Sequence, residues 1–182
     1  MNDRSAKMPP RDPKKADEPI FIGLGANLPS PKHGPPKSTL NAALESLAAR
    51  GLRVTARSRW YESAPVPASD QPWYVNGVVR VATNLAPAAL LAVLHKVEEE
   101  FGRVRGEPNA PRILDLDIIA YGDRVARGKD IPQLPHPRMQ IRGFVLLPLR
   151  EIAPRWQHPL LRQTLDQLIA ALPPDQIARP LG

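Results

Sequence analysis

Residues 112–121 read Arg-Ile-Leu-Asp-Leu-Asp-Ile-Ile-Ala-Tyr, and the fold of the chain is decided here. Polar and apolar side chains alternate in the first half of the stretch, which predicts a β-strand over 113–121. Asp115 and Asp117 then share one face, about 6.6 Å apart along the strand. The other face carries the apolar side chains that would anchor the strand in a core, namely Leu114, Leu116 and Ile118.

The paired carboxylates have two interpretations. Carboxylate oxygens are hard ligands that suit Mg²⁺, and such a pair could bridge two ions about 3.5–4 Å apart. The alternative is an edge strand whose acidic face is simply solvated. The strand alone does not decide between a metal site and a solvated face.

The rest of the chain predicts alternating strands and helices around this strand. Apolar spacings of three and four residues indicate the helices, which Gly51 and Gly102 would end, and the short strands are rich in valine and isoleucine. In chain order the predicted elements are a strand at 20–22 stopped by Gly23 and Gly25, a helix at 40–48, strands at 52–61 and 74–82, a helix at 87–101, the strand at 113–121, and short helices at 143–150 and 164–172.

This order is β-α-β-β-α-β followed by a mostly helical C-terminal extension. It predicts an α+β fold of the ferredoxin-like, split βαβ type, in which two helices pack on one face of an antiparallel sheet. Residues 1–18 are polar, interrupted by proline and free of aromatics, which predicts a disordered N-terminal tail. We expect residues 19–182 to form a single domain.

The composition excludes several classes of protein. The chain of 182 residues contains no cysteine, which excludes a disulfide framework, a thiolate zinc site and a cysteine nucleophile. No apolar run approaches about 18 residues and no signal peptide is visible, so we expect a cytoplasmic protein without a membrane partner. The 23 prolines favour many rigid turns over a bundle of long helices.

The net charge of +7 is concentrated in one segment. Residues 103–162 hold eleven basic and six acidic side chains, and ten of the eleven are arginine, whose planar donors suit phosphate oxygens. Arg103 and Arg105 begin a loop containing glycine and proline that ends at Arg112 and could close over a nucleotide. Phosphoryl-transfer sites combine arginines, which contact phosphate oxygens, with carboxylates, which bind Mg²⁺. The alternative is that these arginines are solvent-exposed side chains of a loop.

Other polar side chains are weaker candidates. Tyr74 and Asn76 share a face of their predicted strand, where an aromatic plane beside an amide could bind a planar heterocycle, or simply pack. His95 and Glu98 flank the apolar stripe of the second helix, and His136 lies between two prolines. Gly23 and Gly25 lack the spacing of a phosphate-binding loop. We expect them to form a tight turn in which two backbone segments approach closely.

Nucleic-acid binding is the principal alternative function, because ferredoxin-like sheets bind RNA and the isoelectric point is about 10.1. The chain has only nine aromatic residues, and no predicted strand carries the basic and aromatic signature of such proteins. A pair of carboxylates on the binding strand would also repel phosphates unless metal ions intervened. We therefore expect no nucleic-acid partner.

Several blocks of sequence occur together in an order typical of one family. They are Gly23–Leu28 (GLGANL), Asp70–Asn76 (DQPWYVN), Gly102–Arg105 (GRVR), Pro111–Asp117 (PRILDLD), Pro135–Met139 (PHPRM) and Arg142–Phe144 (RGF). On these blocks the chain resembles the 6-hydroxymethyl-7,8-dihydropterin pyrophosphokinases of folate biosynthesis over residues 19–172. The resemblance implies transfer of a pyrophosphoryl group from MgATP to the hydroxymethyl oxygen of the pterin, with release of AMP.

The resemblance also implies a role for each matching residue. Asp115 and Asp117 would bind two Mg²⁺ ions, and Arg103 and Arg112 would assist the transfer. The pterin would contact Ser63, Ala64, Val66, Tyr74, Asn76 and Phe144. ATP would contact His95, Glu98, Arg105, Ile118, His136 and Arg142. We expect a monomer that acts on these small molecules.

The chain departs from the family pattern in a few places. Asn109 and Ala110 stand where many relatives carry tryptophan and glycine, in a loop that is one residue shorter, and residues 28–38 are longer and richer in proline. An inactive relative is a third possibility. The intact aspartates and arginines argue against it.

Overall fold

The structure is a computed structural model that describes residues 18–104 and 106–182. Its elements are β1 (Ile20–Ala26), α1 (Pro36–Ala49), β2 (Arg53–Arg57), β3 (Tyr61–Ser63), β4 (Tyr74–Ala82), α2 (Pro87–Glu100), β5 (Asp115–Tyr121), the 3₁₀ turn η1 (Met139–Ile141), α3 (Gly143–Ile152), α4 (Leu165–Ala170) and β6 (Ala178–Pro180). The predicted disordered tail falls on residues 1–17, outside the described part, and on Glu18, whose side chain pairs with Arg124 at 3.1 Å.

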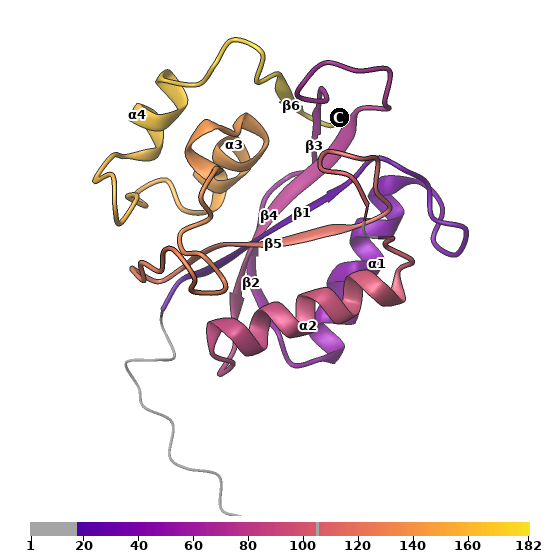
Figure 1. Cartoon of the computed structure of the whole chain (residues 1–182), viewed down its shortest axis with the longest axis horizontal. Helices are drawn as coiled ribbons and strands as arrows, with labels where there is room; N and C mark the ends of the chain where they lie inside the picture. The colour runs from indigo at the N-terminus through magenta and orange to yellow at the C-terminus, as the bar shows by residue number, and fades with distance from the viewer. Residues whose placement is uncertain (1–17, 105) are drawn as a thin grey trace, which may run out of the picture.

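The six strands form one antiparallel sheet. Its order is β5-β1-β4-β3-β6, and β2 pairs with the other half of β4. The order β5-β1-β4-β2 is that of a split βαβ unit, with the site strand β5 at one edge and β1 and β4 in the centre (Figure 1). The predicted α+β, ferredoxin-like fold is therefore confirmed.

Two hydrophobic cores lie on opposite faces of the sheet. On one face α1 and α2 bury their apolar stripes against alternate residues of β1 and β5. Leu116 and Ile118 of β5, and Leu114 just before it, are buried here as predicted. On the other face α3 and α4 cover the opposite side of the same strands, including Phe21 and Ile119 (Figure 1). The sheet thus has a helical layer on each side, and the second layer packs on Phe21, Val78, Ile119 and Ala120.

Strand β1 is longer than the prediction at Ile20–Ile22. Gly23 and Gly25, which we predict to end it, lie within it and pair with both neighbouring strands. A Cβ atom on Gly25 would lie 2.9 Å from Asn76 Oδ1, and one on Gly23 would lie 3.0 Å from Ile119 Cδ1. The predicted tight turn is therefore wrong, but the predicted close approach at these glycines is confirmed.

The single strand predicted at 52–61 is divided into β2 and β3. Between them Ser58 continues the hydrogen bonding to β4, because its N–H donates to Val78 O (3.0 Å) and its Oγ accepts from Val78 N (3.1 Å). Trp60 then packs against the backbone of Gly77, where an added Cβ would lie 2.6 Å from the indole ring. The alternation of side chains predicted the strands but not the break, which depends on a glycine from β4.

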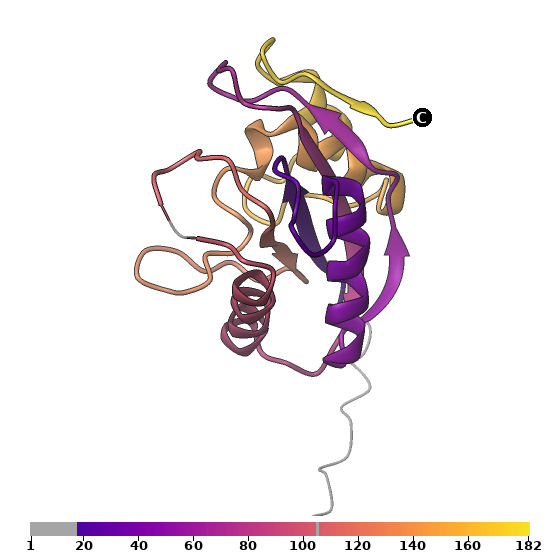
Figure 2. The ribbon, with the colours of Figure 1, turned by 90° about the vertical axis from the view of Figure 1, so that its right-hand side faces the viewer.

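The C-terminal extension is helical as predicted, but it ends in a strand that the sequence did not predict. Thr164 caps α4 with a capping box, accepting from Gln167 N, and Pro148 lies inside α3. Strand β6 then pairs with β3, and Ala64 N donates to Ile177 O (3.1 Å). Figure 2 shows this segment running back along the sheet edge. The extension thereby fixes the loop that follows β3.

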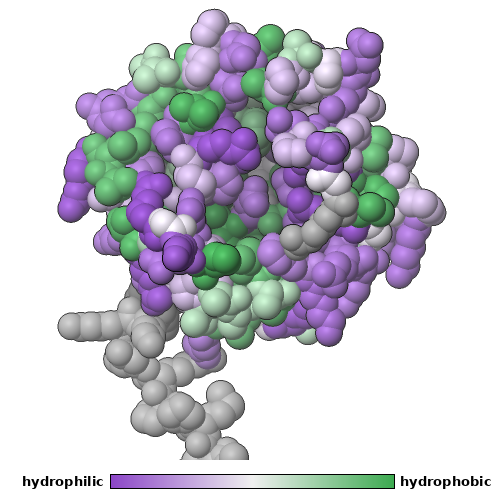
Figure 3. Space-filling model, in the orientation of Figure 1, coloured by the Kyte–Doolittle hydropathy of each residue, from purple (hydrophilic) through white to green (hydrophobic). Residues whose placement is uncertain are grey.

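The surface of the described residues is mainly polar. Hydrophilic residues cover most of the face shown in Figure 3, and the apolar residues there are gathered in small separate groups. Among the residues that the structure describes, no helix has the length and apolar character needed to cross a bilayer.

Candidate active site

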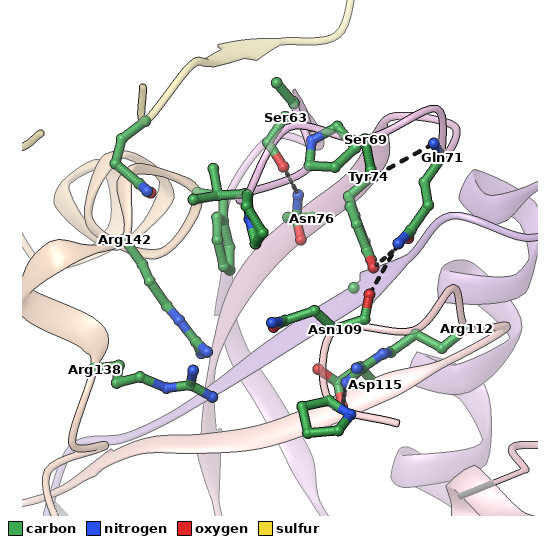
Figure 4. Close-up of a pocket in the computed structure, with 18 of the residues that line it drawn as sticks. Ser63, Ser69, Gln71, Tyr74, Asn76, Asn109, Arg112, Asp115, Arg138 and Arg142 are labelled. Carbon is green, nitrogen blue, oxygen red and sulfur yellow. Dashed lines mark hydrogen bonds and ion pairs between the residues drawn. The ribbon is translucent and has the colours of Figure 1, made fainter. Parts of the chain in front are cut away.

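A cavity of ≈ 430 Å³ lies above β1 and β4 beside the acidic strand, and we call it the first cavity. Its walls come from the β3–β4 loop, the N-terminal turn of α3 and the loop before β5 (Figure 4). Its lining includes Ser63, Ala64, Val66, Tyr74, Asn76 and Phe144, the six residues predicted to bind a pterin. The structure therefore brings together residues from three separate segments of the chain.

One wall of the first cavity has a fixed pattern of hydrogen bonds. Tyr74 and Asn76 share a face of β4, and Asn76 Nδ2 donates to Ser63 Oγ at 2.6 Å. The floor beneath them is Gly25, which lies opposite Asn76 in the sheet. A planar ring fits this space because the floor carries no side chain, while Phe144 and Tyr74 supply aromatic surface.

A second cavity of ≈ 620 Å³ lies along β5 and the 128–133 loop. Asp117, Ile118 and His136 line it, whereas Asp115 lines the first cavity. The two aspartates are therefore positioned at the junction of the two cavities. A molecule in either cavity could reach the carboxylates.

The first of these carboxylates is bound by arginine on two sides. Asp115 Oδ1 lies 2.7 Å from Arg103 Nη1 and 3.2 Å from Arg112 Nη1. Arg103 also pairs with Glu98 Oε1. Arg103 and Arg112 further line a small cavity of ≈ 230 Å³ formed by the loop that joins them. The prediction that both arginines lie beside the acidic strand is confirmed.

Glu98 is the most deeply buried acid of this group, with 2% of its surface exposed. Its Oε1 accepts from Leu116 N (2.7 Å), so a side chain of α2 is tied to β5 between the two aspartates. Burial raises the pKa of Glu98 to about 7, although the Leu116 hydrogen bond and the Arg103 charge act in the opposite direction. The carboxyl of Glu98 is thus protonated far more readily than an exposed glutamate.

The second carboxylate, Asp117, faces a different pair of residues. Its Oδ2 lies 3.7 Å from His136 Nε2 and 3.9 Å from Arg142 Nη1. Burial and the neighbouring charge of Asp115 both raise the pKa of Asp117. Burial, together with the charges of Arg142 and Arg138, lowers the pKa of His136 to about 4, so the imidazole is neutral at pH 7.

Asn27, at the end of β1, joins the two loops that border the first cavity. Its Oδ1 accepts from Arg112 N (2.9 Å), and its Nδ2 donates to Gln71 Oε1 (3.2 Å) and Pro72 O (3.1 Å). Gln71 Nε2 donates in turn to Asn109 O (3.0 Å). With 2% of its surface exposed, Asn27 is a buried connection between the β3–β4 loop and the arginine loop.

The donor set around the aspartates fits Mg²⁺ when a substrate supplies further ligands. Two carboxylates on one face provide hard oxygen atoms, and no group of three or more His, Asp or Glu side chains suited to a metal occurs in the described ranges 18–104 and 106–182. Mg²⁺ is commonly held by one or two carboxylates together with substrate phosphates and water, rather than by a cage of protein ligands.

Comparison with known proteins agrees with this geometry. The sequence model of the family described as 7,8-dihydro-6-hydroxymethylpterin-pyrophosphokinase (HPPK) matches residues 21–154. The chain belongs to this family.

Individual relatives agree with the assignment to HPPK. The chain is 44% identical over 149 residues to a 2-amino-4-hydroxy-6-hydroxymethyldihydropteridine pyrophosphokinase from Synechocystis, covering 81% of this chain and 73% of the relative. It is 41% identical to the protein of the same name from Pseudomonas aeruginosa, covering 90% and 97%. The crystal structure of Plasmodium falciparum HPPK-DHPS has the same fold, with a TM-score of 0.64, 15% identity, and coverage of 86% of this chain and 45% of that one.

The predicted family is thereby confirmed, and with it the predicted enzyme class, a pyrophosphokinase of folate biosynthesis. The predicted ATP contacts are more dispersed than the pterin contacts. Ile118 and His136 line the second cavity, and Arg142 lines the first. His95 is half-buried on α2 and lines neither of these cavities, and Arg105 lies outside the described residues.

Six polar residues at the site were not predicted from the sequence. These are Asn27, Ser69, Gln71, Asn109, Arg138 and Gln176. Asn27, Gln71 and Arg138 lie in blocks that carry the family resemblance, and this was the signal that could have found them. Asn109 takes a positive φ of 61° and lines the cavity at the position where the family pattern has tryptophan. Nothing in the sequence connects Gln176 with the site, because it reaches the cavity only through the C-terminal extension.

Replacement of Asn27 by alanine tests the connection between the two loops. Asn27→Ala leaves the partly buried Arg112 N–H without its acceptor, which we expect to lower the free energy of unfolding by about 1 kcal/mol. The backbone hydrogen bonds from Asn27 N and Leu28 N to Arg112 O remain, but the side-chain links to both loops are lost, so kcat should fall about tenfold. Asn41→Ala, which removes the acceptor of Trp60 Nε1 away from the site, is the control. An Asn27→Ala enzyme with the kcat of the control would contradict the connection.

The burial of Glu98 predicts a pH dependence of stability. Its pKa is about 7 in the folded chain against 4.5 in the unfolded one, so the folded state binds the extra proton between pH 5 and 7. The free energy of unfolding should therefore lose a contribution as the pH rises through this range. Urea unfolding without Mg²⁺ or nucleotide should show Glu98→Gln gaining stability relative to wild type from pH 5 to pH 8. The exposed Glu99→Gln should follow the wild-type curve, and the same curve for Glu98→Gln would refute the assignment.

Proposed function

We propose that this HPPK transfers a pyrophosphoryl group from ATP to the hydroxymethyl group of 6-hydroxymethyl-7,8-dihydropterin, releasing AMP. The hydroxymethyl oxygen forms a bond to the β-phosphorus of ATP. The bond between that phosphorus and the oxygen bridging to the α-phosphate breaks, and the hydroxyl proton passes to water. This reaction yields the pterin diphosphate and AMP.

The observation that carries the proposal is the position of the two aspartates. The first cavity has the aromatic and amide walls that suit a pterin, and the second lies on the other side of the same strand end. Asp115 lines one cavity and Asp117 lines the other. An enzyme that joins a heterocycle to two phosphates of a nucleotide needs its charged groups at such a junction.

The side chains at the junction have distinct tasks. Phosphoryl transfer demands alignment and charge neutralisation more than covalent chemistry from the protein. Arg103 and Arg112, which contact Asp115 in the structure, neutralise the transferred phosphates when these arrive. Tyr74, Asn76 and Phe144 hold the pterin ring in the first cavity. His136 and Ile118 face the nucleotide in the second.

The carboxylates would hold magnesium for this reaction. We propose that Asp115 and Asp117 together bind two Mg²⁺ ions. When bound, the ions act as Lewis acids on the phosphate oxygens and offset the mutual repulsion of the two carboxylates. The raised pKa of Asp117 supports this assignment, because a carboxylate disfavoured by burial and by a second acid gains from a bound cation.

We further propose that the enzyme acts as a cytoplasmic monomer on small molecules, and not on nucleic acid. The acidic edge at Asp115 and Asp117 supports the last of these points, because a nucleic acid lying along β5 would place its phosphates beside the two carboxylates. A single triphosphate can instead end at the two aspartates with its arginine partners around it.

The test of the proposal is the identity of the nucleotide product. The protein is incubated with Mg²⁺, ATP and 6-hydroxymethyl-7,8-dihydropterin, and the products are separated by chromatography. AMP with an equal amount of pterin diphosphate is expected. ADP would show transfer of a single phosphoryl group, and the absence of any pterin-dependent product would refute the function.

Isosteric variants of the aspartates test the proposed metal ligands. Asp115→Asn and Asp117→Asn keep the shape of the side chain but remove its charge, and we expect each to lower kcat by about 100-fold or more. Asp123→Asn, an exposed residue in the turn after β5, is the matched control and should retain wild-type activity. Raising Mg²⁺ should restore part of the lost rate if metal binding is the defect. Near wild-type turnover in either site variant would contradict the assignment.

A further inference from the structure

Arg138 is a cationic residue of the first cavity that neither the pterin contacts nor the nucleotide contacts account for. It precedes η1 and lines the cavity, and Figure 4 shows its side chain extending, beside that of Arg142, toward the space above the sheet. Its backbone N–H donates to His136 Nδ1 at 3.1 Å. Within residues 18–104 and 106–182, its guanidinium makes no hydrogen bond or ion pair.

The charge of Arg138 is unbalanced by the protein. Three arginines line the first cavity, namely Arg112, Arg138 and Arg142, against the single acid Asp115. Asp115 is already shared by Arg103 and Arg112. Burial lowers the pKa of both His136 and Arg142, and the charge of Arg138 acts in the same direction. An anionic group bound beside Arg138 would offset this gathering of like charge.

The rest of the cavity shows where that anion belongs. Apolar and amide side chains on the β3 and β4 side receive the ring of the ligand, whereas the guanidinium groups are gathered on the η1 and β5 side. A ligand that fills both parts has a planar ring and an attached anionic group. The free pterin alcohol has only the ring, but its diphosphate ester has both.

We propose that Arg138 binds the diphosphate once it is attached to the pterin, and so makes the first cavity select the phosphorylated pterin over the alcohol. This inference rests on the proposed function. The exposure of Arg138 would also suit a solvated surface arginine. That interpretation does not explain why the side chain extends into the first cavity beside two other arginines. A planar guanidinium donates to phosphate oxygens through several N–H groups, which a lysine cannot reproduce fully.

The test compares two ligands on the same protein. Calorimetry measures the affinity of wild type, Arg138→Ala and Arg138→Lys for 6-hydroxymethylpterin and for its diphosphate ester. Arg138→Ala keeps the backbone hydrogen bond to His136. Its affinity for the diphosphate should fall about 10- to 100-fold, the range of a charge-assisted hydrogen bond, while its affinity for the alcohol stays within about twofold. Arg138→Lys should recover part of the loss, and the exposed Arg155→Ala should match wild type for both ligands.

Each outcome has a defined meaning. Equal losses for alcohol and diphosphate would show that Arg138 only supports the shape of the cavity, and unchanged affinities would show that it is a solvated arginine; either result overturns the inference. AMP, which lacks the transferred phosphates, should bind all variants alike. If wild type forms no pterin diphosphate from ATP, the proposed function fails, whereas the affinities for the synthetic ester still decide the role of Arg138.

Discussion

The site depends on the pairing of β1 with its two neighbours through residues that have no side chain. Gly25 lies opposite Asn76 on one side and Asp115 on the other, and Gly23 lies opposite Asp117. Residues directly opposite in an antiparallel sheet point to the same face, so a side chain on Gly25 would enter the first cavity, and one on Gly23 would press on Ile119 beside it. The glycines therefore leave a bare strip of backbone between the residues that we propose hold the ring and those that we propose hold the phosphates.

The alternation of side chains along β5 explains why acidic and basic groups can gather at the site without destabilising the fold. The acidic face of β5 is opposite an apolar face that is fully buried beneath α1 and α2. The core thus stabilises the strand, and the carboxylates need only be compensated on their own side. Arginines from loops supply this compensation, since Arg103 and Arg112 share Asp115. The excess of positive charge is consequently a local property of residues 103–162, where we propose that phosphates bind, and prolines such as Pro65, Pro67 and Pro108 line the first cavity.

Periodicity in the sequence was sufficient to predict those helices and strands whose pattern of apolar residues is local. The helices α1 and α2, the strands β4 and β5 and the direction of Asp115 and Asp117 all follow from alternation or from spacings of three and four residues. The remaining features of the fold depend on contacts between residues far apart in the sequence. Gly23 and Gly25 look like strand breakers until both neighbouring strands are known, and Trp60 divides β2 from β3 only because Gly77 lies beneath it.

The candidate site was predicted to a similar extent and for similar reasons. The six residues that the resemblance assigned to the pterin all line the first cavity, although only Tyr74, Asn76 and Phe144 lie within the quoted blocks. Side chains that act through hydrogen bonds between blocks were not predicted, because no local pattern marks Asn27 as the acceptor for Arg112 or Gln176 as part of a cavity wall. The proline-rich segment after β1 also gains a role only in three dimensions, where His33 stacks on Phe101 at the start of the arginine loop (4.6 Å between ring centres).

The most direct measurement of the central claim is a crystal structure of the enzyme with Mg²⁺, a non-hydrolysable ATP analogue and 6-hydroxymethylpterin. The pterin should lie over Gly25 between Tyr74 and Phe144, the nucleoside in the second cavity, and the phosphates between them with metal ions on Asp115 and Asp117. A nucleoside bound in the first cavity, or phosphates bound away from the two aspartates, would contradict the account.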